Sequence, residues 1–234
     1  MGMEQVYKEV MQINVSEDKE KQRQAAKAFF EKLNHMEKPE YFNWASEILE
    51  GLHVKESGDK TALFWADLET DEERQFTYKE FADNGNKCLN FMRSKGVEQG
   101  HNVYMMIPIV PETWFVSLAA VKGGLIAVPT ATSMTIRELK FRFETYPPDV
   151  IVADQASADV MDEALAEAKG QPKVKIVLGQ RDGWTSYADL ETESDQAEPA
   201  KTKSDDLLFC FFTSGTTGLP KRVGHSARSY PLGH

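Results

Sequence analysis

The sequence predicts an α/β fold in which a mostly parallel sheet is covered by helices on both faces. From residue 100 onward, short apolar segments alternate with helical patterns, which is the order that βαβ units produce. Most of these segments are apolar throughout, as strands buried on both faces are. The chain has 234 residues, 41% of them hydrophobic, which suits one large domain or two small ones.

Residues 1–99 are expected to form the N-terminal helices, a hairpin and the first large helix. The charged stretch 16–33 places Ala and Phe on one helical face behind Ser16, a plausible N-cap. The hairpin prediction rests on two strands rich in aromatic and β-branched residues, joined by the polar sequence LETDEE. The elements expected after residue 33 are a helix at 42–52, strands at 60–67 and 74–78, and a helix at 77–96.

Residues 100–234 are expected to form a subdomain of alternating strands and helices that ends in a glycine-rich loop. One helix has Pro111 near its start and glycine at its end, which are typical boundary residues. Strands are predicted at 102–108, 125–129, 149–154, 174–179 and 207–212, and helices at 111–124, 135–146 and 157–169. The acidic stretch 191–206 is predicted to be a surface loop.

Composition narrows the classes of function. The net charge of −10 argues against a general nucleic-acid binder, because neutralising phosphates needs an excess of Lys and Arg. Only two cysteines are present, Cys88 and Cys210, so neither a disulfide framework nor a zinc site is expected and a cytoplasmic location is the default. The first residues do not follow the signal-peptide pattern, and no apolar run is long enough to span a membrane.

The nine residues TSGTTGLPK, at 213–221, follow the last apolar strand. Open parallel sheets bind ligands at the carboxyl ends of their strands. The glycines let backbone amides turn toward an anion, the hydroxyls donate hydrogen bonds, and the lysine supplies a positive charge. The residues expected to hold the phosphates of a nucleotide are Thr213, Ser214, Gly215, Thr216, Thr217, Gly218 and Lys221.

This loop differs from the Walker A pattern. Pro220 stands before the lysine, where that pattern has glycine, and Arg222 follows it, where the pattern has Ser or Thr. Two other interpretations stay open at this point. One is a phosphotransferase or NTPase with an atypical phosphate loop, and the other is a fragment that binds a nucleotide or a partner without catalysis. A Gly/Thr-rich surface turn with no ligand is a weaker alternative.

The loop resembles the phosphate-binding signature of the adenylate-forming enzymes, which include acyl-CoA synthetases, peptide-synthetase adenylation domains and luciferases. Two further segments are similar to motifs of that family, FTYKEF at 76–81 and AAVKGGLIAVPT at 119–130. The segment YFNWASEILE at 41–50 resembles the opening of medium-chain acyl-CoA synthetases. The resemblance covers nearly the whole chain but only the N-terminal part of a family member, within its large domain.

The resemblance implies a two-step ligation of a short- or medium-chain carboxylic acid to coenzyme A. ATP, as its Mg²⁺ complex, first gives an acyl-adenylate and pyrophosphate, and coenzyme A then gives the thioester and AMP. Lys221 is expected to act in the first step. Arg142 is weighed as a contact to a coenzyme A phosphate, against a solvated position on its helix. His225 is expected to pack or cap rather than catalyse, and Trp114 and Phe115 to belong to the core.

The adenine, ribose and C-terminal motifs of the family are absent from the 234 residues. The chain is therefore interpreted as the N-terminal segment of a longer synthetase, and residues 1–234 are expected to be inactive on their own. The expected partners are a carboxylic acid, ATP and coenzyme A, with a homo-oligomer left open.

Overall fold

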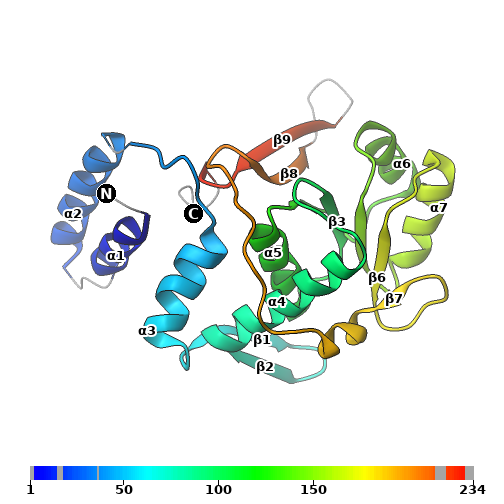
Figure 1. The fold of residues 1–234 in the computed structure, drawn as a ribbon, viewed down its shortest axis with the longest axis horizontal. Coiled ribbons are helices and arrows are strands. Elements are labelled where there is room, and N and C mark those ends of the chain that lie inside the picture. Colours follow the sequence, from blue (N-terminus) through cyan, green and yellow to red (C-terminus); the bar gives the residue numbers. More distant parts are fainter. Residues whose placement is uncertain (1–2, 15–17, 36, 214–219, 230–234) are drawn as a thin grey trace.

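A computed structural model describes residues 3–14, 18–35, 37–213 and 220–229 of the chain. Within these residues a seven-stranded sheet lies between helices, and a separate two-stranded hairpin lies beside it (Figure 1). The strands are β1 (Thr61–Asp67), β2 (Glu72–Thr77), β3 (Asn102–Met106), β4 (Ile126–Pro129), β5 (Val150–Asp154), β6 (Val174–Leu178), β7 (Thr185–Ser186), β8 (Leu207–Thr213) and β9 (Lys221–Ser226). The helices are α1 (Met3–Asn14), α2 (Lys19–Asn34), the π-helix η1 (Ala45–Val54), α3 (Lys55–Ser57), α4 (Tyr78–Ser94), α5 (Pro111–Gly123), α6 (Ile136–Thr145), α7 (Ala158–Ala168) and the 3₁₀ helix η2 (Tyr187–Thr192).

The large sheet has the strand order β7-β6-β5-β3-β4-β8-β9. Neighbouring strands are parallel from β7 to β8, and only the edge strand β9 runs antiparallel to its neighbour β8. The predicted mostly parallel sheet is therefore confirmed. The short strand β7 and the helix η2 after it were not predicted, because their few residues carry no periodic pattern.

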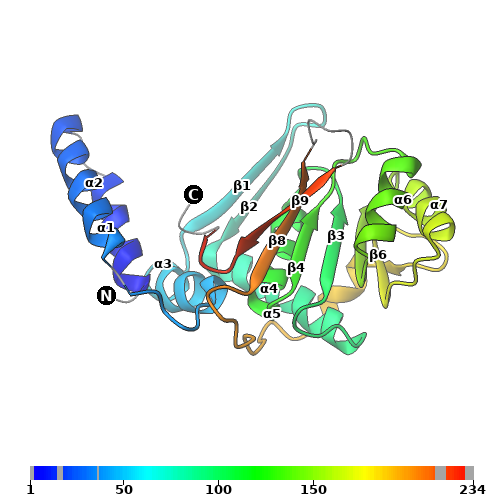
Figure 2. The same ribbon diagram turned by 90° about the horizontal axis from the view of Figure 1, so that it is seen from above.

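Helices cover both faces of the sheet, as predicted (Figures 1 and 2). Along β3, Val103 and Met105 belong to one buried cluster with side chains of α4 and α5. The alternate residues Tyr104 and Met106 belong to a second cluster, with side chains of α6 and α7. Successive strand residues point to opposite faces, so one short apolar strand supplies two cores. This is why the central strands β3, β4 and β5 show no alternation of apolar and polar residues.

The first two helices extend away from the body of the molecule at its N-terminal side (Figure 2). The expected N-cap Ser16 lies outside the described residues. The helix α2 begins at Lys19, and Asp18 Oδ1 accepts hydrogen bonds from the amides of Glu20 and Lys21 at 3.0 and 3.1 Å. The short helix expected at 42–52 is the π-helix η1, whose Ile48 and Leu49 are buried.

A buried polar network joins the N-terminal part to the sheet. The Lys122 side chain on α5 is only 4% exposed, and its amine lies 2.6 Å from Glu50 Oε1 of η1 and 2.7 Å from Asn86 Oδ1 of α4. Asn86 also donates to the carbonyl of Asp195, in the stretch predicted as a surface loop. Ser204 in that stretch is fully buried, so the loop is partly packed rather than wholly exposed. These bonds satisfy polar groups that burial would otherwise penalise.

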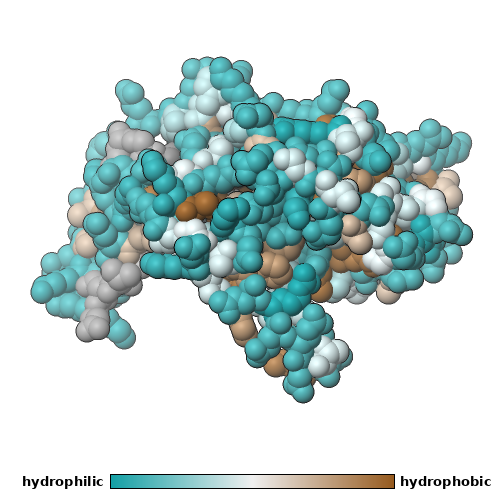
Figure 3. All heavy atoms as spheres, turned by 60° about the horizontal axis from the view of Figure 1, so that its bottom comes forward, coloured by the Kyte–Doolittle hydropathy of each residue, from teal (hydrophilic) through white to brown (hydrophobic). Residues whose placement is uncertain are grey.

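The surface carries both polar and apolar side chains. On the face that Figure 3 shows, apolar side chains form small groups among polar ones. Among the described residues, none of the helices is both long and apolar enough to cross a membrane.

Candidate functional site

The candidate phosphate loop joins β8 to β9. The first and last residues of the nine-residue motif, Thr213 and Lys221, face each other across the two strands. The Thr213 hydroxyl donates to the Lys221 carbonyl at 3.5 Å. The predicted residues Ser214, Gly215, Thr216, Thr217 and Gly218 lie outside the described residues.

The sequence positions this hairpin through the two faces of β8. Phe209 and Phe211 pack toward the cluster that contains α4 and α5, whereas Cys210 and Phe212 pack toward α6 and α7. The strand β8 also runs parallel to β4. Thr213 therefore stands at the carboxyl end of a parallel strand, where the sequence predicts a ligand site. Because β9 returns antiparallel, it brings Lys221 to the same end of the sheet.

Positive charge gathers at this end of the hairpin. The side chains of Lys221 and Arg222 are exposed. The ion pairs found within the described part of the chain do not include either residue. Cations without a carboxylate partner can bind a phosphate without first breaking an ion pair. Lys221 is thus exposed at the carboxyl end of β8, and its contact with a phosphate stays a prediction.

Arg142 does not lie on a solvated helix face. Its side chain on α6 is 6% exposed, and its guanidinium carbon lies 4.6 Å from the centre of the Phe212 ring. The Arg142 Nε atom is buried and has no hydrogen-bond partner within the described part of the chain. Burial lowers the pKa of the Arg142 guanidinium. The alternative of a solvated position is therefore wrong, while the contact to coenzyme A stays a prediction.

The three other residues considered in the sequence either pack against neighbouring side chains or line a cavity. His225 on β9 meets the Phe211 ring edge to face, with ring centres 5.5 Å apart, which is a packing contact. Phe115 is 2% exposed and belongs to the core, as expected. Trp114, also expected in the core, is instead half-buried and lines a cavity.

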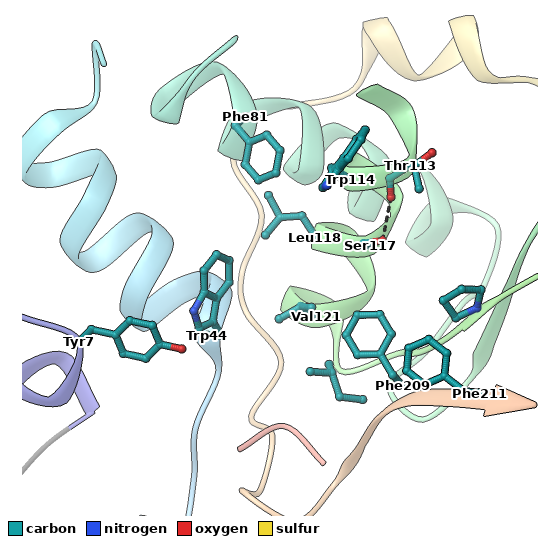
Figure 4. Close-up of a pocket in the computed structure, with 12 residues that line it drawn as sticks. Tyr7, Trp44, Phe81, Thr113, Trp114, Ser117, Leu118, Val121, Phe209 and Phe211 are labelled. Atoms are coloured by element: carbon teal, nitrogen blue, oxygen red, sulfur yellow. Dashed lines mark hydrogen bonds between the residues drawn. The ribbon is translucent and has the colours of Figure 1, made fainter. Parts of the chain in front are cut away.

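This cavity of about 480 Å³ lies between η1, α5 and β8 (Figure 4). Its hydroxyl groups are already engaged, since Thr113 donates to the Pro108 carbonyl and Ser117 to the Thr113 carbonyl, both at 2.7 Å. It suits an apolar group and lacks the cations that a phosphate requires. The lining residues are Tyr7, Trp44, Phe81, Thr113, Trp114, Ser117, Leu118, Val121, Pro129, Leu208, Phe209 and Phe211.

A metal site is not evident. Within the ranges that the structure describes, His, Cys, Asp and Glu side chains do not come together in groups of three or more that could hold an ion. Both cysteines are buried and free, and burial raises the pKa of the Cys88 thiol to about 12. Neither thiol is therefore activated as a nucleophile or metal ligand.

The model of the AMP-binding enzyme family matches residues 52–231. The chain belongs to this family. It is 44% identical over 192 residues to 4-hydroxybutyrate–CoA ligase 1 of Metallosphaera sedula, a match that covers 82% of this chain and 33% of the relative. It is also 33% identical over 201 residues to the mitochondrial acyl-coenzyme A synthetase ACSM5 of Homo sapiens, covering 83% of this chain and 35% of the relative.

Among solved structures, the chain resembles the anthranilate CoA ligase AuaEII, which was crystallised with anthranoyl-AMP. The TM-score is 0.75 at 26% sequence identity, over 83% of this chain and 36% of the other. The chain thus spans about one third of the length of the relatives that it matches. The predicted family, and the fold as the N-terminal part of an adenylate-forming enzyme, are confirmed.

Sequence reasoning missed the contacts that hold the base of the hairpin. Besides Arg142 on Phe212, the Arg222 guanidinium carbon lies 5.0 Å from the centre of the Tyr146 ring. The available signal was the spacing of Arg142 and Tyr146, which are four residues apart and so lie on one helical face. The strand register that pairs Phe212 with Arg222 appears only in the folded structure.

Proposed function

We propose that the protein containing this chain is an acyl-CoA ligase that activates a short- or medium-chain carboxylic acid with Mg·ATP and transfers the acyl group to coenzyme A. The observation that carries the proposal is the TSGTTGLPK loop at the carboxyl end of β8, in a chain that belongs to the AMP-binding enzymes. The similarity to a 4-hydroxybutyrate–CoA ligase supports a short acid.

The first step joins the acid to the nucleotide. A carboxylate oxygen attacks the α-phosphorus of ATP, and the bond to the bridging oxygen of the β-phosphate breaks. The products are acyl-adenylate and pyrophosphate, and the leaving pyrophosphate carries the displaced negative charge. The Lys221 amine and the loop hydroxyls, including Thr213, stabilise that charge as it develops. Carboxylate and triphosphate repel each other, so the loop also has to hold the nucleotide in line for attack.

The second step forms the thioester. The thiol of coenzyme A loses its proton and attacks the acyl carbonyl carbon, and AMP leaves with the electron pair of the broken carbon–oxygen bond. Pyrophosphate has departed by then, so Lys221 has no role in this step. The predicted contact between Arg142 and a coenzyme A phosphate is not needed for the proposal, and the position of Arg142 against Phe212 favours a different role, argued below.

Magnesium enters as the complex of ATP. The ion is bound to the phosphates and is therefore part of the substrate. Its charge offsets that of the β- and γ-phosphates, and the lysine adds to this effect.

Product analysis tests the proposal. The full-length protein is incubated with Mg·ATP, coenzyme A and, in separate reactions, acetate, butyrate, 4-hydroxybutyrate, hexanoate and benzoate. We expect AMP, pyrophosphate and a thioester, with the highest kcat/KM for a four-carbon acid. Formation of ADP and phosphate would instead support a phosphotransferase. ATP consumption that is independent of the acid would contradict ligation.

A further inference from the structure

Two contacts between a cation and an aromatic ring join α6 to the hairpin. The Arg142 guanidinium of α6 lies 4.6 Å from the ring centre of Phe212 on β8. The Arg222 guanidinium of β9 lies 5.0 Å from the ring centre of Tyr146, which follows α6 as its C-cap. The helix thus supplies the cation in one contact and the ring in the other. Such contacts are worth about 0.5–2 kcal/mol each.

Both contacts act on one pair of residues. Phe212 and Arg222 face each other across β8 and β9, and the next pair in the register is Thr213 with Lys221. The contacts from α6 therefore reach the hairpin at the Phe212–Arg222 pair, which is one residue away from the two ends of the phosphate loop on each strand. Arg142 and Tyr146 can reach both strands together because the C-cap Tyr146 lies one turn after Arg142, and its amide donates to the Arg142 carbonyl.

The helix offers a fixed support. Its Leu139 and Phe143 are 0% and 1% exposed in the core beneath it. The Tyr146 amide donates to the Arg142 carbonyl at 2.7 Å, and the Tyr146 carbonyl accepts from the Tyr104 hydroxyl at 2.9 Å. The strand β9, in contrast, is the edge strand and its first four residues are exposed. An edge ribbon twists easily unless neighbouring elements hold it.

The burial of Arg142 is hard to explain by a contribution to the stability of the fold. Burying a charged group without an ion pair or a full set of hydrogen bonds costs free energy, and Arg142 Nε has no partner within the described part of the chain. The nearby Glu138 carboxylate is engaged by Thr135, whose amide and hydroxyl both donate to it. An apolar side chain would fill the place at lower cost. An arginine at position 142 is better explained by the contact between its guanidinium and the Phe212 ring.

We propose that Arg142 and Tyr146 are positioning residues, which fix the base of the β8–β9 hairpin so that Thr213 and Lys221 face a nucleotide phosphate. The inference rests on the proposed function, because it assumes that this loop binds phosphate. It requires no direct contact between Arg142 and the ligand. A fixed base lowers the conformational cost of binding, which is the general benefit of preorganisation.

The test measures the dissociation constant of Mg·ATP by titration calorimetry in the full-length protein, at a temperature where circular dichroism shows each variant to be folded. Arg142→Met and Tyr146→Leu are each expected to weaken binding by about 3- to 10-fold. Tyr146→Phe keeps the ring and is expected to bind like the wild type. Arg137→Met, at an exposed arginine on the same helix, is the matched control and is expected to change nothing.

A double variant separates positioning from direct contact. If Arg142 acts through Phe212, then Phe212→Leu weakens binding as much as Arg142→Met, and the double variant is no weaker than either single one. Wild-type affinity in folded Arg142→Met and Tyr146→Leu would overturn the inference. So would a loss with Arg142→Met that Phe212→Leu does not reproduce, since that indicates direct contact with the ligand. A wild-type protein that does not bind Mg·ATP would instead overturn the proposed function, and this inference with it.

Discussion

The molecule contains two antiparallel hairpins with different chemistry at their tips. In the first, β1 and β2 pair along their length and the sequence LETD connects them. Leu68 in this turn is 93% exposed, and Asp71 has a φ of 56°. The second hairpin, β8–β9, pairs just as regularly, but its connection carries hydroxyls and glycines, and Lys221 follows as the first residue of β9. A hairpin therefore provides a shape, and the residues of its turn decide what it can bind.

The two hairpins are held by similar means. In the first, Arg74 pairs with Glu112 of α5 at 2.8 Å and its guanidinium lies 5.2 Å from the Phe76 ring centre. The Trp65 indole nitrogen also donates to the Ile109 carbonyl at 2.8 Å. In the second, α6 provides the ring and cation contacts described above. The difference lies in the surroundings, because only β8 lies within the parallel sheet and ends at its carboxyl edge, where open parallel sheets bind ligands.

If the protein has the proposed ligase activity, the largest expected effect comes from Lys221→Ala in the full-length protein. Loss of one preorganised donor costs on the order of 3 kcal/mol, which slows adenylation by a factor of about 10². ATP binding is expected to weaken less, because the charge on the leaving pyrophosphate is larger in the transition state than in bound ATP. Single-turnover measurements of the two half-reactions test this. Thioester formation from preformed acyl-adenylate should stay near normal, and equal slowing of both steps would indicate a structural role instead.

Thr216→Ala and Thr217→Ala are expected to act in the same direction with smaller effects. Each removes a neutral hydroxyl donor, worth about 1 kcal/mol or a factor of about 5 in adenylation rate. The matched control is Thr70→Ala in the turn of the first hairpin, where the rate should not change. An equal loss at Thr70 would show that the two turns do not differ in function.

Arg74→Met tests the first hairpin for stability rather than binding. The ion pair with Glu112 is partly exposed, so losing it together with the Phe76 contact should lower the free energy of unfolding by about 1 kcal/mol. Denaturant titration measures the loss. Mg·ATP binding by the folded variant should match the wild type, and a clear decrease would place the first hairpin in the nucleotide site.

The smallest expected effect is a pH dependence at the base of the first hairpin. The His53 ring stacks on Tyr78, directly after β2, with ring centres 5.0 Å apart, and burial lowers the pKa of His53. The unfolded chain, with a His pKa of about 6.5, therefore binds the proton more readily. Stability should be unaffected above about pH 7.5 and should fall as the pH drops through 6.5 toward the lowered pKa.

His53→Phe keeps a stacked ring without the titrating group. The difference in unfolding temperature between pH 7.5 and pH 5.5 should be smaller in this variant than in the wild type. The same pH response in both proteins would mean that His53 does not contribute to it.

Much of the fold could be predicted because local patterns and tertiary structure agree. Thr77 and Glu80 form a complete capping box at the start of α4, within a segment that the sequence marks as a helix start. Gly124 ends α5 with a φ of 62°, a conformation that glycine adopts at little cost. The π-helical form of η1 could not be predicted, since its residues have an ordinary helical pattern.

The sequence predicts a phosphate-binding loop, and this stays a prediction, but it does not predict the contacts that support the loop. Composition and order alone are enough to propose Thr213 and Lys221 as phosphate contacts, because phosphate binding needs particular residue types close together in sequence. For Arg142 the sequence leaves a solvated helix face or a contact to a coenzyme A phosphate, since an arginine on a helix is usually exposed. Its burial against Phe212 depends on how α6 crosses the hairpin, which only the packed sheet determines.

Hydrogen exchange with and without Mg·ATP tests the central claim, that the second hairpin and not the first binds the nucleotide. In the full-length protein, peptides covering β8, β9 and the end of α6 should exchange more slowly when Mg·ATP is bound, while those covering β1 and β2 should not change. Protection of β1 and β2, or of the apolar cavity beside α5, without protection of β8 and β9 would contradict the account.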